Sequence, residues 1–78
     1  MLFKVYGKNS CKYCTLAIEH LEMLGKDYVY MVLDEDYNLS DFKSTFPGAT
    51  SVPQIMTVSN TEVHNIGGYD ELKELLKG

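Results

Sequence analysis

The chain carries two cysteines, Cys11 and Cys14, and they are its only thiols. They follow a short apolar stretch over residues 2–6 and open a helical pattern over residues 12–24. Cys11 is therefore expected at a helix N-terminus, where unpaired N–H groups and the helix dipole lower the pKa of a thiol. Cys14 follows one helical turn later on the same face, so the two can close a disulfide. A C-x-x-C pair in this setting is typical of a redox motif whose thiolate is the nucleophile.

Composition and charge are those of a small soluble protein. The chain has 78 residues, 45% hydrophobic and 23% charged, and we expect residues 1–78 to form a single domain. The net charge of −4 argues against nucleic acid as a partner. No apolar run approaches the roughly 20 residues of a membrane span, and the N-terminus has no signal-peptide pattern. We therefore expect a cytoplasmic protein, in which a C-x-x-C pair is more often catalytic or metal-binding than structural.

Hydrophobic periodicity and turn residues predict seven elements in the order β-α-β-α-β-β-α. The first strand, helix and second strand read as a right-handed βαβ unit with parallel strands. The last two strands read as a hairpin around Ser59-Asn60-Thr61, which lacks the usual Asn-Gly turn signal. The predicted strands cover residues 2–6, 28–33, 55–58 and 62–66, and the predicted helices cover 12–24, 40–46 and 69–77.

Each predicted helix has an apolar face and recognisable ends. Gly25 is expected to end the first helix, Ser40 to cap the second, and Pro47-Gly48 to stop it. The residues expected to face the core are Cys14, Ala17, Ile18, Leu21 and Leu24 in the first helix, Leu39, Phe42 and Phe46 in the second, and Leu72, Leu75 and Leu76 in the third.

The charged residues are unevenly distributed. Lys4, Lys8 and Lys12 are expected to cluster around the cysteines, where a locally basic mouth would attract an anionic thiol and favour the Cys11 thiolate. The alternative is that these lysines are simply solvated. The acidic run over residues 34–36 is expected to be a solvated turn.

Several motifs stand in an order that points to one family. The chain resembles glutaredoxins of the dithiol C-x-x-C type, in their short bacterial or phage-like form, over nearly its full length. The resemblance implies an α/β thioredoxin fold in which three helices flank a four-stranded mixed sheet. The matching pieces are Lys8, Cys11-Lys12-Tyr13-Cys14, Phe46-Pro47-Gly48, Ser51-Val52-Pro53-Gln54-Ile55 and Gly67-Gly68-Tyr69-Asp70.

The resemblance assigns a role to each cysteine. Cys11 would attack a disulfide or a glutathionylated cysteine, and Cys14 would resolve the mixed disulfide. For glutathione mixed disulfides Cys11 alone could suffice, with a second glutathione releasing it. The alternative of two inert, buried cysteines conflicts with the helix-start position of Cys11.

The resemblance also assigns glutathione-binding residues. It implies a cis bond between Val52 and Pro53, next to the cysteines, with the backbone of residue 52 pairing with the cysteinyl part of glutathione. Ser51 keeps the hydroxyl that the family has as threonine. Without the resemblance, Pro53 would be read as the start of an edge strand.

The two ends of glutathione would bind to other residues. Gly68, Tyr69 and Asp70 would hold the γ-glutamyl end, with Asp70 facing its ammonium group and backbone N–H groups facing its carboxylate. Lys8 would face the glycyl carboxylate, and Tyr13 would flank the thiol. Asp70 could equally be a helix-capping carboxylate.

Three features depart from the familiar family pattern. Lys12 stands where proline is usual, which adds an N–H group and a positive charge near Cys11. Tyr69 replaces a small residue. The chain contains no arginine, so any carboxylate must be held by lysine or backbone groups.

The leading hypothesis is a glutathione-dependent thiol-disulfide oxidoreductase that acts on protein disulfides and glutathione mixed disulfides. Glutathione would be its co-substrate, with no permanently bound cofactor or metal, and the protein would be a monomer. Ribonucleotide reductase is a family substrate and hence a candidate partner. The alternatives are a redoxin reduced by thioredoxin reductase and a dimer holding a [2Fe–2S] cluster through glutathione and Cys11. A zinc site with His20 and His64 lacks any supporting ligand spacing.

Overall fold

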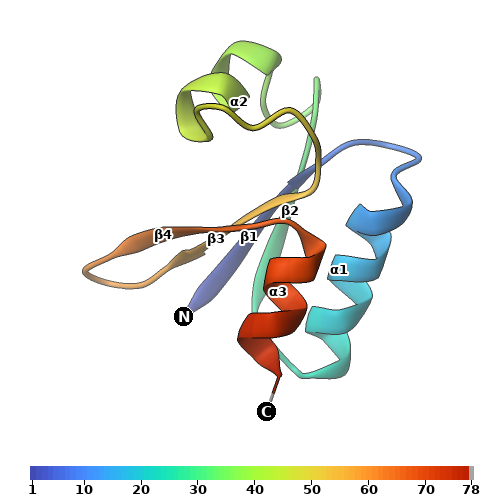
Figure 1. Cartoon of the computed structure of the whole chain (residues 1–78), viewed down its shortest axis with the longest axis vertical. Helices are drawn as coiled ribbons and strands as arrows, with labels where there is room; N and C mark the ends of the chain where they lie inside the picture. The colour runs from blue at the N-terminus through green and yellow to red at the C-terminus, as the bar shows by residue number, and fades with distance from the viewer. Residues whose placement is uncertain (78) are drawn as a thin grey trace.

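Four strands form one mixed sheet in the order β2-β1-β3-β4 in the computed structural model, which describes residues 1–77 (Figure 1). Strand β1 runs parallel to β2 and antiparallel to β3, and β3 runs antiparallel to β4. The central position of β1 fits its apolar sequence, because a strand with helices over it is buried on both faces. The strands are β1 (Leu2–Gly7), β2 (Tyr28–Val32), β3 (Gln54–Val58) and β4 (Val63–Gly67).

Three helices cover the two faces of this sheet. Helices α1 (Lys12–Met23) and α3 (Tyr69–Leu76) lie side by side on one face, and the short helix α2 (Leu39–Thr45) belongs to the other (Figure 1). The predicted element order and α/β architecture are confirmed. None of the helices in residues 1–77 has the length and apolar character needed to span a membrane.

The alternation of side chains along β1 and β3 builds two separate cores. The main core lies under α1 and α3 and is largely aliphatic. The aromatic core lies between the sheet and α2. The main core consists of Phe3, Val5, Ala17, Leu21, Ile55 and Leu72, and the aromatic core consists of Tyr37, Phe42, Phe46 and Met56.

Both helix ends and strand ends differ from the sequence-based prediction. Helix α1 stops at Met23, and Leu24 is its C-cap with 44% of its surface exposed, so it is not a core residue. Gly25 follows with φ +67°, as expected of a residue that ends a helix.

The predicted cap of α2 was wrong. Asn38, not Ser40, is the N-cap: its side-chain oxygen accepts a bond of 2.8 Å from the N–H of Asp41, and the Asp41 carboxylate accepts one of 3.3 Å from the N–H of Asn38. The spacing Asn-x-x-Asp allows both bonds at once, whereas Ser40 lies inside the first turn.

The other boundaries that differ from the prediction shifted by one residue. Leu33 is not in β2 but forms an isolated bridge with Tyr37, and the hairpin turn closes through the Ser59 N–H and the Glu62 carbonyl at 2.9 Å. Leu39 and Leu75 were expected in the core but are 56% and 54% exposed. Both lie on short helices whose single buried position, Phe42 or Leu72, supplies the contact with the sheet.

Candidate active site

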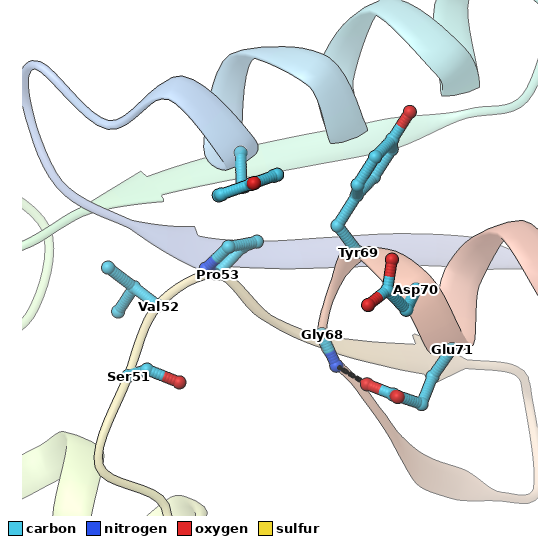
Figure 2. Close-up of a pocket in the computed structure, with 8 residues that line it drawn as sticks. Ser51, Val52, Pro53, Gly68, Tyr69, Asp70 and Glu71 are labelled. Atoms are coloured by element: carbon cyan, nitrogen blue, oxygen red, sulfur yellow. Dashed lines mark hydrogen bonds between the residues drawn. The ribbon is translucent and has the colours of Figure 1, made fainter.

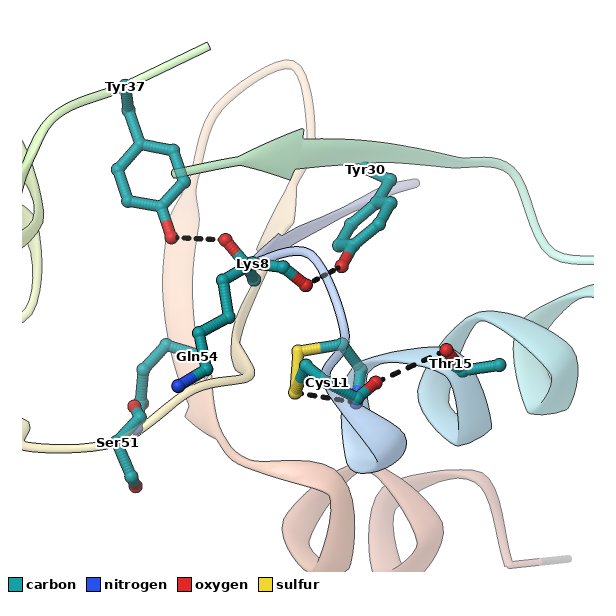
Figure 3. Close-up of a disulfide and its surroundings, with 9 residues drawn as sticks. Lys8, Cys11, Thr15, Tyr30, Tyr37, Ser51 and Gln54 are labelled. Carbon is teal, nitrogen blue, oxygen red and sulfur yellow. Dashed lines mark hydrogen bonds between the residues drawn. A yellow bond between two sulfur atoms is a disulfide. The ribbon is translucent and has the colours of Figure 1, made fainter. Parts of the chain in front are cut away.

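The two cysteines lie where β1 passes into α1. Cys11 is the N-cap of α1, and its sulfur accepts a hydrogen bond of 3.3 Å from the N–H of Cys14. The Cα atoms are 5.3 Å apart and the sulfurs form a disulfide (Figure 3). Cys11 is partly exposed and Cys14 is completely buried. An incoming thiol or disulfide can therefore reach Cys11, and the N–H bond to its sulfur favours the thiolate.

Two tyrosine hydroxyls anchor the loop that carries Cys11. Tyr37 donates to the carbonyl of Gly7 at 2.7 Å, and Tyr30 donates to the carbonyl of Lys8 at 2.9 Å (Figure 3). Burial raises the pKa of Tyr30. The pKa of Tyr37 is raised first by burial and then by the nearby Tyr30, Tyr6 and Asp34. Both hydroxyls therefore stay protonated and keep donating.

Gly7 brings the end of β1 close to the resolving thiol. A Cβ atom at Gly7 would lie 2.6 Å from the sulfur of Cys14 and 2.7 Å from the Tyr30 ring. The sequence-based prediction ended the first strand before Gly7 and gave Tyr30 and Tyr37 no role at the site, so these positioning roles were missed. Nothing in the spacing of Tyr30, in β2, and Tyr37, just before α2, could have revealed them.

A cleft of about 280 Å³ is lined by most of the predicted binding residues (Figure 2). Ser51, Val52 and Pro53 lie on one side of it, and the start of α3 lies on the other. The Val52–Pro53 bond is cis, as the sequence resemblance implies. Seven predicted residues line this cleft: Tyr13, Ser51, Val52, Pro53, Gly68, Tyr69 and Asp70.

Val52 offers an unused edge of backbone to the cleft. Neither its N–H nor its carbonyl has a hydrogen-bond partner within residues 1–77. The adjacent carbonyl of Ser51 is held by the Gln54 amide at 3.1 Å, which fixes the segment. A free N–H and C=O at one residue can pair with an extended peptide as a strand would.

The start of α3 adds a residue that the sequence analysis missed. Glu71 also lines the cleft, and its carboxylate accepts a hydrogen bond of 2.6 Å from the N–H of Gly68. The N–H of Gly68 is thus already satisfied within the protein. Gly68 has no side chain to cap the next N–H groups, so those of Tyr69 and Asp70 remain for a carboxylate. The Gly-x-x-Glu spacing, half of a capping box, was the signal that could have identified Glu71.

Tyr69 forms a wall of the cleft. Its ring centroid lies 6.1 Å from that of Tyr13, and the Lys73 ammonium lies 4.8 Å above the Tyr69 ring. Lys73 also approaches the Asp70 carboxylate at 3.7 Å, but both groups are exposed, so this pair is weak. The large residue at position 69 therefore closes one side of the cleft, where the family usually has a small residue.

Lys8 does not line the same cleft. It lies in a neighbouring recess that shares Ser51 and Val52 with the cleft, and its side chain extends toward Ser51 and Gln54 (Figure 3). Lys4 does not join the cysteines, because it alternates with Phe3 and Val5 and so points to the sheet face opposite α1. The predicted cluster of three lysines was wrong in this respect.

The acidic run and the potential metal-ligating side chains of residues 1–77 add no further site. The acidic run over residues 34–36 is an exposed turn, as predicted. Within residues 1–77, no three or more histidine, cysteine, aspartate or glutamate side chains come together in a way that could hold a metal ion.

A family model described as Glutaredoxin matches residues 3–64 of the chain. The chain belongs to the glutaredoxin family. The match includes Lys8, the cysteine pair and Ser51-Val52-Pro53, and it ends before Gly68. A glutaredoxin with a Cys11–Cys14 pair able to close a disulfide is a thiol-disulfide oxidoreductase.

The structural comparison extends over more of this glutaredoxin. Glutaredoxin 1 from Francisella tularensis, solved in complex with cacodylate, superposes with a TM-score of 0.69 at 27% sequence identity. The alignment covers 94% of this chain and 88% of the other. The thioredoxin fold is thereby confirmed. No curated protein sequence matches the chain.

Proposed function

We propose that this glutaredoxin takes its electrons from glutathione. The observation that carries the proposal is the order of charges along the site. Two carboxylates, Asp70 and Glu71, line the cleft at α3, and Lys8 lies in the adjoining recess beyond Val52. Glutathione has the matching polarity, with an ammonium group at its γ-glutamyl end and a carboxylate at its glycyl end. The unpaired backbone of Val52 lies between the two charged ends.

The γ-glutamyl end fits the start of α3. Its ammonium group would face Asp70 and Glu71, and its carboxylate would accept from the first-turn N–H groups of Tyr69 and Asp70. Gly68 supports this arrangement because a Cβ there would lie 3.3 Å from the Glu71 carboxylate and 3.4 Å from the carbonyl of Pro53. A side chain at position 68 would therefore crowd this end of the cleft.

The rest of glutathione would follow the backbone toward Lys8. Its cysteinyl N–H and C=O would pair with Val52, which directs its sulfur to Cys11, with Tyr13 beside the thiol. Its glycyl carboxylate would approach the Lys8 ammonium. Ser51 and Pro53 complete the wall of the cleft.

The chemistry then proceeds by thiol–disulfide exchange. The Cys11 thiolate attacks the glutathione sulfur of a mixed disulfide, forming a Cys11–glutathione bond as the protein thiolate leaves. A second glutathione thiolate attacks that adduct, which releases glutathione disulfide and restores the Cys11 thiolate. With a protein disulfide as substrate, Cys11 attacks one sulfur, and the Cys14 thiolate then attacks Cys11 and releases the reduced protein. The Cys11–Cys14 disulfide so formed is reduced by two glutathiones.

The test is reduction of a small glutathione mixed disulfide, coupled to glutathione reductase, for the parent, Cys11→Ser and Cys14→Ser. We expect activity to vanish in Cys11→Ser and to survive in part in Cys14→Ser, because the buried thiol is needed only for the second route. Lys8→Gln should raise KM for the glutathione substrate more than it lowers kcat. An inactive parent that turns over once thioredoxin reductase replaces glutathione would contradict the proposal.

The colour and the molecular mass of the same preparation distinguish the dithiol enzyme from the iron–sulfur alternative. A glutathione-ligated [2Fe–2S] dimer would be brown as purified and would elute at twice the monomer mass, whereas the dithiol enzyme is colourless. Monomeric state, cytoplasmic location, a single domain over residues 1–78 and ribonucleotide reductase as a protein substrate stay predictions.

A further inference from the structure

A second, apolar recess of about 180 Å³ adjoins the cleft. Leu33, Leu39 and Phe42 form its apolar wall, with the buried Tyr37 beside them. Ser51 and Val52 line both the recess and the cleft, so the two are continuous along one backbone segment. Among the residues described, Lys8 is the only charged side chain in its lining.

Two features of this recess leave it open to a ligand. Leu39 is 56% exposed although it begins α2 next to the redox site. Lys8 forms no ion pair with any carboxylate of residues 1–77. An exposed leucine in an apolar wall, beside an unpaired cation, suits a ligand that offers an apolar group and a carboxylate together.

Glutathione cannot fill this recess. In the binding direction of the proposed function, its γ-glutamyl end lies at α3 and its chain ends at the glycyl carboxylate near Lys8. Glycine has no side chain, so nothing reaches the wall formed by Leu33 and Leu39. A polypeptide bound along Val52 in the same direction would continue past this point, and the residues after its reacting cysteine would enter the recess.

We propose that this recess is a specificity site for protein substrates. It takes an aliphatic or aromatic side chain from one of the two residues that follow the reacting cysteine, while Lys8 pairs with an adjacent acidic side chain. The volume is sufficient, since an apolar cavity of about 150 Å³ in another protein holds benzene. The proposal rests on the proposed function for the direction of the bound chain.

The experiment measures exchange at Cys11 in a Cys14→Ser background. The Cys11 thiolate first attacks glutathione disulfide, which forms the Cys11–glutathione disulfide and releases one glutathione. Free glutathione is removed and a peptide thiol is added. The peptide sulfur forms a bond to Cys11 and glutathione leaves as the free thiol, so no other oxidant or reductant is consumed. Intact-mass spectrometry gives the equilibrium constant. Two acetylated peptides are compared, one with leucine and one with alanine at both positions after the cysteine, and both with aspartate next.

The leucine peptide should exceed the alanine peptide in exchange constant by about fivefold, as expected for partial burial of one leucine side chain. Leu39→Ser should reduce this ratio toward one. Leu75→Ser is the matched control: its leucine is 54% exposed, belongs to α3 and does not line the recess, so the ratio should be kept.

A ratio of one in the parent background, an unchanged ratio in Leu39→Ser, or failure of both peptides to form an adduct would each overturn the proposal. The ratio compares two peptides with each other and does not depend on how tightly glutathione binds. Failure of the glutathione proposal would appear instead as an inactive parent in the coupled assay, with the peptide ratio intact.

Discussion

The two faces of the sheet carry different kinds of core. Under α1 and α3, Val5, Leu21 and Leu72 are completely buried, and Cys14 is buried beside them. On the other face, Tyr37, Phe42 and Phe46 keep a few per cent of their surface exposed. The Tyr37 ring stacks on that of Phe42, and the Phe42 and Phe46 rings are tilted against each other. The first face is a close-packed interior, and the second is an aromatic layer under a single short helix.

The two faces contribute different parts of the active site. The main core fixes the resolving thiol, because α1 packs directly on β1 and α3. Within residues 1–77 the backbone of α2 has no close approach to another helix or strand, and aromatic side chains make its contact with the sheet. The chemistry is therefore built on the rigid face, and the recess for substrate side chains lies against the more adjustable one.

The largest expected effect is the difference in unfolding free energy between alanine substitutions at Leu21 and at Leu39. Leu21→Ala removes a completely buried side chain from the main core and should lower the free energy of unfolding by about 3 kcal/mol. Leu39→Ala makes the same chemical change at a 56% exposed position and should cost under about 0.5 kcal/mol. Urea unfolding of the oxidised proteins measures both values. Equal losses would show that α2 is packed as firmly as α1.

The next largest effect is expected for a substitution at Gly7, compared with the same substitution at Gly48. Gly7→Ala would place a Cβ 2.6 Å from the buried Cys14 sulfur, and relief of this overlap should cost about 1–3 kcal/mol. Because Cys14 is displaced, reduction of protein disulfides should fall more than reduction of glutathione mixed disulfides. Both rates are measured on the same preparation.

Gly48→Ala is the control for this change. Gly48 follows α2 with φ +84°, and a Cβ there would meet nothing within 4 Å. It should cost about 1–2 kcal/mol through the left-handed backbone alone and leave both rates unchanged. A Gly7→Ala protein with both rates intact would mean that the end of β1 does not position Cys14.

A smaller effect tests whether α2 opens by itself. Asn38→Ala removes the oxygen that accepts from the Asp41 N–H, a cap typically worth about 1 kcal/mol. Amide hydrogen exchange should accelerate in α2 while the slowest amides of β1 and α1 change less, as expected for local opening. Ser40→Ala, at the position that sequence reasoning favoured, should have little effect. Uniform acceleration across the sheet would contradict separate opening of α2.

Sequence reasoning succeeded where a signal is local. The order of elements follows from periodicity, and the placement of Cys11 at a helix start follows from a strand directly before a helical pattern. The cleft residues came from motifs around Ser51-Val52-Pro53 and Gly68, which the fold brings together from distant segments.

The failures have a common physical cause. Exposure of Leu24, Leu39 and Leu75 depends on how far each short helix extends over the sheet, which periodicity does not contain. The hydroxyl bonds of Tyr30 and Tyr37 join residues 22 and 30 positions apart. Such contacts exist only once strand order and register are set, so a single sequence gives no sign of them.

The smallest effect concerns the hydroxyl that joins the two faces. Tyr37 belongs to the aromatic core, yet it donates to the Gly7 carbonyl at the end of β1, and burial raises its pKa. At neutral pH, Tyr37→Phe should lose about 1 kcal/mol of unfolding free energy with the hydrogen bond.

The pH dependence of that loss gives a sharper test. A pKa raised by folding means that the stabilisation is complete below the unfolded tyrosine pKa of about 10 and is lost as the pH rises through the higher folded pKa. The parent should therefore lose stability above pH 10 faster than Tyr37→Phe, and the difference between them should shrink. Urea unfolding of the oxidised proteins from pH 7 to pH 11 measures this difference, and Tyr13→Phe, at an exposed ring, is the control. A constant difference across that range would show that the Tyr37 hydroxyl ionises as easily in the fold as in the unfolded chain, and that the aromatic layer does not shield the bond that ties it to the cysteine loop.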